Sequence, residues 1–213
     1  MNIHLWGLDA RSLPVSLLDR WERQPFTPGT LAGPGARDRR DSYQREVAQE
    51  KPGEPEIGGP HERVAAAIMR YEIFPPWMIS GVLRRVPVRE GDTVGILFHS
   101  PVGAKLFFAA RAIEVFDSPG EGPTEKGQKG RLWRTGFTYR TLLGHPELGE
   151  ETFAVEKELD TGIVRASLRS WSRPGTLLAR TFAPVVRMLQ VRASYAALDH
   201  LASIAASAAR SQG

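Results

Sequence analysis

Three strand-like runs followed by one long helical pattern are the feature of this sequence that most restricts its fold. The runs occupy residues 131–143, 152–159 and 162–171 and are joined by short turns, so neighbouring runs should pair as antiparallel hairpins. A helical pattern follows a Ser-Arg-Pro-Gly stop at 172–175, and Pro184 within it predicts a kink. Its apolar stripe consists of Leu178, Phe182, Val185, Leu189, Ala193 and Ala196. This order predicts an α+β protein in which a long C-terminal helix lies across an antiparallel sheet of about six or seven strands.

The middle of the chain supplies the rest of this sheet and a second helix. Residues 61–74 place apolar side chains at helical spacing, and Pro75 predicts the end of that helix. Residues 93–99 predict a strand after a Glu-Gly-Asp turn, and another β-rich run covers 103–118. The segment 118–130 is rich in proline, glycine and charge, which predicts a long hairpin connection without regular structure.

Residues 1–60 differ from the remainder and predict an N-terminal arm ahead of a domain that covers 61–213. Prolines alternate with glycines through much of this arm, which leaves room only for short helices. One short helix is expected at 13–21 and a polar one at 41–50. Two roles are open for the arm: a lid over a pocket, or packing over the surface of the core.

Composition excludes several classes of protein. The chain has no cysteine, which rules out disulfides, thiolate catalysis and cysteine zinc sites. No apolar run reaches the about eighteen residues of a membrane-spanning helix, and the N-terminus lacks the pattern of a secretory signal, so a cytoplasmic location is expected. The net charge is +4, but basic residues alternate with Asp and Glu. Nucleic-acid binding is therefore disfavoured, because it would need a concentrated basic stripe.

Two motifs in the C-terminal half resemble those of a family of uncharacterised proteins, a domain-of-unknown-function (UPF) family. They are GHPE-x-GEE within residues 135–158 and SRP…LAR…P…LQ within 167–190, and the similarity extends back through AAAIMRYEIFPP at 65–76 and EGDTVGIL at 90–97. The family looks like a distant relative of the START and pollen-allergen-like (SRPBCC) helix-grip proteins. The resemblance implies a curved antiparallel sheet wrapped around a long C-terminal helix, with a cavity between them that often holds a lipophilic ligand. It implies no catalytic residue and no cofactor.

Residues two apart on a strand share a face, so alternation separates the expected cavity face from the outer face. Val164, Ala166 and Leu168 form a small apolar set that should face the helix, which places Arg165 and Arg169 in solvent unless they bind an acidic ligand. A tyrosine can point its hydroxyl group into an apolar cavity, although a half-buried sheet tyrosine is the alternative. The candidates for ligand binding in the cavity are Tyr139, His99, His145, Glu147, Phe137, Trp171 and Phe182.

A histidine, a proline and three carboxyl groups gather in residues 144–151, between two expected strands. His145, Glu147, Glu150 and Glu151 could bind a divalent ion, but on a turn their side chains would splay into solvent. The glycines and the proline favour a rigid hairpin turn, with the histidine and the first glutamate at the mouth of the cavity. The remaining histidines are scattered, so no metal site is expected, and no dinucleotide or phosphate-loop motif implies a cofactor.

Three functions remain open. The first is binding of a small lipophilic or amphipathic ligand between the sheet and the C-terminal helix, which rests on element order and on the family resemblance. The second is an enzyme of cyclase or hydrolase type, in which Tyr139, His99 or His145, and Glu147 handle protons. The third is an interaction module whose N-terminal arm contacts a partner or a second copy, as in a homodimer.

Overall fold

Seven antiparallel strands form one sheet in the order β1-β7-β6-β5-β4-β3-β2. The structure is a computed structural model that describes the chain except residues 1–15, 37, 100–104, 125–126, 175–182 and 208–213. The strands are β1 (Arg39–Gln49), β2 (Ile79–Val82), β3 (Thr93–His99), β4 (Lys105–Pro123), β5 (Lys129–Thr141), β6 (Glu147–Glu158) and β7 (Ile163–Pro174). The helices are α1 (Ser16–Glu22), α2 (Pro60–Met69) and α4 (Ala183–Ser207).

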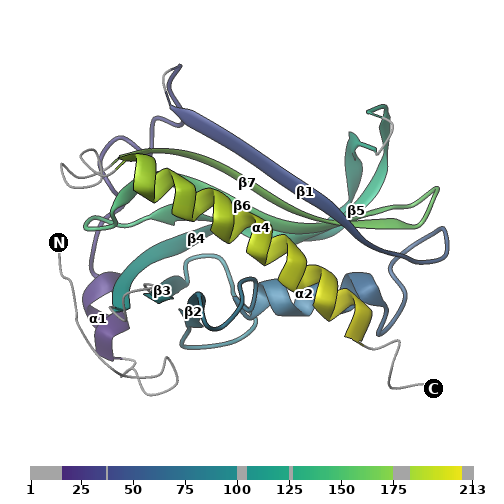
Figure 1. The fold of residues 1–213 in the computed structure, drawn as a ribbon, viewed down its shortest axis with the longest axis horizontal. Helices are drawn as coiled ribbons and strands as arrows, with labels where there is room; N and C mark the ends of the chain where they lie inside the picture. The colour runs from purple at the N-terminus through teal and green to yellow at the C-terminus, as the bar shows by residue number, and fades with distance from the viewer. Residues whose placement is uncertain (1–15, 37, 100–104, 125–126, 175–182, 208–213) are drawn as a thin grey trace.

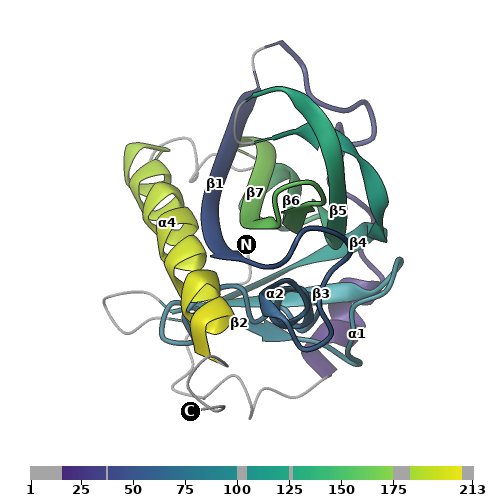
Figure 2. The ribbon, with the colours of Figure 1, turned by 90° about the vertical axis from the view of Figure 1, so that its right-hand side faces the viewer.

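The sheet curves around its inner face, and α4 runs along that face from the β1 edge to α2 (Figures 1 and 2). Shifts of register between Glu46 and Ala48 in β1 and between Ala112 and Glu114 in β4 mark β-bulges, which bend a strand and increase its twist. The predicted α+β, helix-grip architecture is confirmed, and both predicted helices are present. The helix predicted over 61–74 is shorter than expected, because α2 ends at Met69 and not just before Pro75.

The core lies between the inner face of the sheet and the two longer helices. Val164, Ala166 and Leu168 are buried there, as their alternation predicted, and they belong to one apolar cluster with Ala197 and Leu201 of α4. The cluster continues across the sheet through Phe137, Phe153 and Val155 and into α2 through Val64, Ala67 and Ile68. Burial of this apolar surface is what holds α4 on the sheet.

The start of α4 lies at the edge of the described residues. The helix is described from Ala183, so the turn before Pro184, where a kink was predicted, falls outside the described residues. Leu178 and Phe182 of the predicted stripe also lie outside them. None of the described helices is long and apolar enough to cross a membrane.

The segment 41–50, predicted as a short polar helix, is instead most of the edge strand β1, which pairs with β7 along its length. Arg39, Asp41 and Tyr43 are partly buried and alternate with exposed neighbours. Hydrogen bonding to β7 outweighs the small difference in local propensity between helix and strand for such residues. The division of the chain at residue 60 stays a prediction, and β1 joins the part before it to the sheet.

Two connections are shorter than predicted. The segment 118–130 is not structureless, because β4 and β5 stay paired as far as Pro123 and Lys129 and form a ribbon that projects from the sheet (Figure 1). In the segment 144–151, the predicted turn is confirmed only for its first residues, where Gly144 has a φ of 103°. From Glu147 onward the chain is already strand β6.

The outer face of the sheet carries cross-strand ion pairs. Arg165, predicted to lie in solvent, is 5 % exposed and pairs with Glu158, so that prediction is wrong. Arg169 stays partly exposed and pairs with Glu156. On this face, side chains of opposite charge pack against each other across neighbouring strands. They are partly shielded from water, and each charge keeps a partner.

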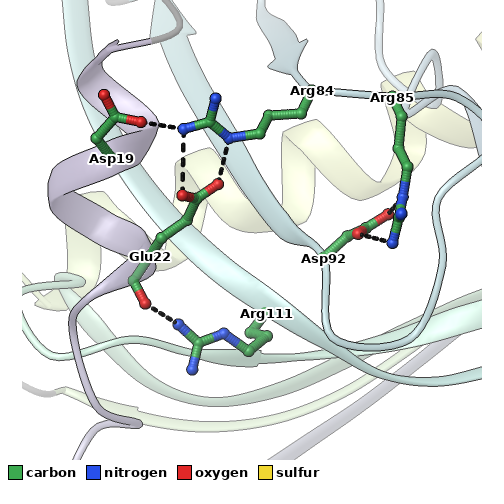
Figure 3. A network of polar contacts seen from close by, with 6 residues as sticks. All are labelled: Asp19, Glu22, Arg84, Arg85, Asp92 and Arg111. Carbon is green, nitrogen blue, oxygen red and sulfur yellow. Dashed lines mark hydrogen bonds and ion pairs between the residues drawn. The ribbon is translucent and has the colours of Figure 1, made fainter.

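Helix α1, predicted at 13–21, packs on the outer side of β3 and β4. Leu18 and Trp21 are buried there in a second apolar cluster. Arg84 pairs with both acidic side chains of α1, and Arg111 donates a hydrogen bond of 2.7 Å to the carbonyl of Glu22 (Figure 3). These contacts fix α1 on the sheet at some distance in sequence from the strands it covers.

Candidate functional site

A cavity of about 420 Å³ lies between the inner face of the sheet, the N-terminal half of α4 and the segment that follows α2. One wall is apolar and comes from β2, β3, β4 and the segment that follows α2: Phe74, Ile79, Ile96, Phe98, Leu106 and Phe108. The other wall comes from β1, β5, β6, β7 and α4 and includes the apolar residues Trp171, Leu189 and Ala193. It carries most of the polar groups of the cavity: Asp41, Tyr43, Tyr139, Glu147, Glu151, Ser170, Ser172, Arg187 and Gln190. The cavity is therefore amphipathic, with its polar groups gathered on one side.

Strand alternation builds the polar wall. Glu147, Gly149 and Glu151 share the inner face of β6, whereas Glu150 lies on the outer face, where it accepts a hydrogen bond from Trp171 Nε1 at 3.0 Å. Position 149 requires glycine, because a Cβ there would lie 2.0 Å from the carbonyl oxygen of Trp171. The absence of a side chain between the two inner glutamates leaves that part of the wall open to the cavity.

A phenol and a carboxyl group meet on this wall. The Tyr139 hydroxyl donates a hydrogen bond of 2.7 Å to Glu151 Oε2, and Tyr139 is also hydrogen-bonded to Tyr71. Burial raises the pKa of Glu151 to about 7; the hydrogen bond from Tyr139 opposes this, and the charge of Asp41 adds to it. Burial also raises the pKa of both phenols, so they stay protonated at neutral pH. Glu151 is thus poised to exchange a proton near neutral pH.

Tyr71 is held in an unusual backbone conformation. Its φ is 55°, the one positive φ among the described non-glycine residues, and a bulky residue rarely adopts such an angle without a compensating contact. Its side chain packs against Gly81, where a Cβ would come within 2.7 Å of Tyr71 Cδ1. The ring also meets Phe153 and Phe74 at centroid distances of 5.9 and 6.2 Å. The positive φ of Tyr71 therefore accompanies the placement of its phenol beside Tyr139.

Two arginines connect the polar wall to neighbouring elements. Arg187 of α4 binds both oxygens of Asp41 on β1, at 2.6 and 2.7 Å, and donates to the Tyr43 hydroxyl at 3.3 Å. Arg39 of β1 donates to Gln190 Oε1 of α4 at 3.1 Å. The bidentate Arg187–Asp41 pair is of the more directional kind of ion pair in proteins, and together with the Arg39–Gln190 hydrogen bond it fixes the register of α4 against the edge strand.

His145 and Glu147 border the cavity beside the β5–β6 turn. The imidazole is 8 % exposed, its edge meets the Phe108 ring at 4.5 Å between centroids, and its Nδ1 lies 2.8 Å from the Glu147 carbonyl oxygen. Burial lowers the pKa of His145 to about 4, so the ring is neutral at pH 7. Burial raises the pKa of Glu147, opposed by hydrogen bonds from Ser172 and Gln190 and by the charge of Arg39.

The predicted site residues separate into three groups. Tyr139, His145 and Glu147 line the cavity, and Trp171 borders it although its indole points to the outer face. Phe137 lies in the core and His99 contacts Ser80 at 3.2 Å, and neither is among the residues that line the cavity. Phe182 lies outside the described residues. Sequence reasoning missed Asp41, Tyr43, Tyr71 and Arg187 as cavity residues and considered Glu151 only as a metal ligand.

The carboxyl groups around the β5–β6 turn do not converge on one point. Alternation sends Glu150 to the outer face, where Arg140 Nε lies 2.6 Å from it, and Glu147 and Glu151 to the inner face. Within the part of the chain that the structure describes, no group of three histidine or carboxyl side chains has a geometry that could hold a metal ion.

Comparisons with known proteins place the chain among uncharacterised relatives. A family model described as "Domain of unknown function (DUF1990)" matches residues 23–200. A UPF0548 protein of Dictyostelium discoideum is 30% identical over 135 residues, which make up 61% of this chain and 58% of that protein, so the chain spans little more than half of this curated relative.

Solved structures are similar in fold. A hypothetical protein of Helicobacter pylori has a TM-score of 0.50 and 14% sequence identity, over 81% of this chain and 91% of that one. A point mutant of a Thalictrum norcoclaurine synthase, in complex with a transition-state analogue, has a TM-score of 0.39 and 11% identity, over 76% of this chain and 96% of that one. At 14% identity the likeness to the Helicobacter protein concerns the fold alone.

Proposed function

We propose that this chain, which belongs to the family described as "Domain of unknown function (DUF1990)", binds a small amphipathic molecule in the cavity between its sheet and α4. The family match confirms the membership expected from the two C-terminal motifs. One observation carries the proposal: a cavity of about 420 Å³ has an apolar wall facing a wall of hydrogen-bonding groups. Small-molecule sites in proteins have this size and this division, because apolar surface supplies affinity and a few polar groups fix orientation.

The polar wall also explains why the cavity is not simply a packing defect. Empty cavities in proteins are usually apolar, since a buried polar group without a partner is costly. Here the side chain of Glu151 is hydrogen-bonded to the neutral phenol of Tyr139, and Glu147 Oε2 is buried without a hydrogen bond. A ligand with a polar head and an apolar body would satisfy these groups and cover the opposite wall.

Native mass spectrometry of gently purified protein tests the proposal directly. We expect a bound small molecule that is released on denaturation. The variant Ala193→Phe places a ring into the cavity from α4, and it should lose the bound mass. Ala206→Phe adds the same ring to an exposed position of the same helix and should keep it. Retention of the molecule by Ala193→Phe, once circular dichroism has shown that it is folded, would place the ligand elsewhere.

The other two functions stay predictions. An enzyme would need its proton-handling groups at a common cavity, and of those named only Tyr139, His145 and Glu147 border this one. Turnover assays on any molecule recovered from the protein are the test of that function. An interaction module should form a homodimer, which sedimentation equilibrium measures.

A further inference from the structure

The charges of the polar wall do not cancel. Among the described residues that line the cavity, Asp41, Glu147 and Glu151 bring three carboxyl groups and Arg187 brings a guanidinium group. Arg39 is not part of the lining, and its guanidinium group donates to Gln190, which is. Glu150 borders the same space but is paired with Arg140 on the outer face. His145 adds no charge at neutral pH, because burial lowers its pKa to about 4.

Each arginine is engaged with a particular carboxyl group. Arg187 binds Asp41 through two hydrogen bonds of 2.6 and 2.7 Å. The charge of Arg39 stabilises the ionised form of Glu147. Glu151 is therefore the carboxyl group of the wall without a cation among the described residues, and the hydrogen bond that it accepts comes from the neutral phenol of Tyr139.

Apart from the Tyr139 hydroxyl, whose hydrogen bond favours the ionised carboxylate, the surroundings of Glu151 oppose a negative charge there. Asp41 of β1 lies in the same cross-strand row as Glu151, with Ser170 of β7 between them. It adds negative charge, and its own arginine, Arg187, is already paired with it. Tyr139 of β5 and Tyr71 after α2 are neutral phenols, because burial raises their pKa. An ionised carboxyl group in such surroundings lacks the counter-charge that buried ions normally have, and this explains why burial raises the pKa of Glu151.

The missing partner has a definite chemistry. We propose that the ligand is a lipophilic amine whose ammonium group pairs with Glu151, a conclusion that rests on the proposed binding function of the cavity. An ammonium group supplies the absent positive charge and up to three donors for carboxyl and hydroxyl oxygens. A carboxylate or phosphate head would meet two carboxyl groups, and a neutral alcohol would leave the charge of Glu151 uncompensated.

The rest of the cavity fits the same class of ligand. The rings of Tyr43, Tyr71 and Tyr139 belong to the lining around the carboxyl group, and aromatic faces attract a desolvated cation. The apolar body of the ligand would lie against Ile79, Ile96 and the phenylalanines of the opposite wall. Glu151 thus sets the orientation, with the amine on the β6 side.

Three probes with the same eight-carbon chain separate head-group chemistry from apolar burial: octylamine, octanol and octanoate. Isothermal titration at pH 8 should give the tightest binding for octylamine, about tenfold tighter than octanol, the size expected of one charge-assisted hydrogen bond. Octanoate should bind most weakly. Between pH 5.5 and pH 8 the preference for the amine should grow, because Glu151 must lose its proton to attract the cation, whereas octanol binding should stay constant.

A variant assigns the preference to one side chain. Glu151→Gln keeps the size of the group and a hydrogen bond to Tyr139, so octanol should still bind while the preference for octylamine and its pH dependence disappear. Glu46→Gln, which removes an exposed carboxyl group from β1, should change neither.

The outcomes distinguish the two proposals. If octylamine and octanol bind wild-type protein equally at pH 8, or octanoate binds most tightly, the amine proposal is overturned and the binding function of the cavity stands. If the preference for the amine persists in Glu151→Gln, Glu151 is not its cause and the proposal is likewise overturned. If no probe binds and no molecule co-purifies, both proposals are overturned.

Discussion

Two buried carboxyl groups lie at the inner face of β6, and their surroundings shift their pKa values in opposite directions. Glu50 accepts hydrogen bonds from Lys157 Nζ at 2.7 Å, from the His61 backbone N–H at 2.7 Å and from that of Glu56 at 3.1 Å. Burial acts to raise its pKa, but Lys157 and the two backbone donors outweigh burial and lower it. Glu151, further along the same face, accepts a hydrogen bond from the neutral Tyr139 hydroxyl, and burial raises its pKa to about 7.

The difference separates a structural group from a functional one. The side chains of Lys157 and Glu50 have 0 % exposure, and the Glu50 carboxylate holds the loop before α2 to the sheet through the backbone N–H groups of Glu56 and His61. Glu151 connects no loop to the sheet, and it lines the cavity. A strained or under-satisfied group that persists in a well-packed fold points to a use outside folding.

Breaking the satisfied pair should have the largest effect on stability. Lys157→Met leaves Glu50 buried without its counter-charge, which typically costs about 3–5 kcal/mol of unfolding free energy. Urea denaturation measures the loss. Adding Glu50→Gln should recover part of it, because the buried charge is then gone. A loss below about 1 kcal/mol for the single variant would show that the pair does not hold this end of the sheet.

Removing the unsatisfied carboxyl group should have the opposite sign and depend on pH. The folded-state pKa of Glu151, about 7, lies above the ordinary value of 4.5, so the folded chain binds this proton more tightly than the unfolded chain. Wild-type stability therefore falls as pH rises from about 4.5 through about 7, by at most about 3 kcal/mol from this group. Glu151→Gln should be spared that fall.

Urea denaturation at a series of pH values between 4.5 and 8 makes the comparison. The difference in unfolding free energy between Glu151→Gln and wild type should grow in favour of the variant across this window. Glu46→Gln, at an exposed position of β1, is the matched control. A flat difference for Glu151→Gln would mean that the carboxyl group is better solvated or better paired than its one hydrogen bond indicates.

The same polar wall marks where sequence patterns failed. Strand β3, the strands β5 and β7 and helix α2 were predicted because their inward side chains are apolar, as at Val164 and Leu168. Strand β1 was missed because its inward residues include Arg39, Asp41 and Tyr43, which line or border the cavity instead of filling the core. The first half of β6 was taken for a turn for the same reason, since Glu147 and Glu151 face inward.

The candidate site could be predicted only in part. Tyr139 was identified because it lies among apolar residues on a clear strand, so its hydroxyl needed a partner. Its partner Glu151 could not be chosen over Glu150, because a shift of one residue in register exchanges the two faces of a strand. Tyr71 depends on a positive φ and on the space over Gly81, neither of which hydrophobic periodicity reveals.

Displacing Tyr71 tests whether the packing of its ring against Gly81 holds it beside Tyr139. In Gly81→Ala the new methyl group would come within 2.7 Å of the Tyr71 ring, so we expect a loss of about 1–3 kcal/mol of unfolding free energy, as for other overpacked cores. The tyrosine should also move from Tyr139, which a change in its ring NMR signals would report. Gly120→Ala, where a Cβ meets no atom within 4 Å, should cost little. Equal stability of the two variants would show that the ring is free to shift.

The smallest expected effect on stability comes from the cation that serves Asp41. Arg187→Met breaks a partly exposed pair, so the loss of unfolding free energy should be about 1 kcal/mol or less. The substitution should also change the pKa of Glu151. The charge of Asp41 already raises that pKa, and without Arg187 the charge of Asp41 would act unopposed. Carboxyl-carbon NMR titration should therefore show Glu151 titrating above its wild-type midpoint.

Arg45→Met is the control. It removes the exposed ion pair between Arg45 and Asp199, which joins the same strand and helix, and should leave that midpoint unchanged. A midpoint that falls in Arg187→Met would mean that the charges of the wall are arranged differently from the pairing of Asp41 with Arg187, and the case for a cationic ligand at Glu151 would fall with it.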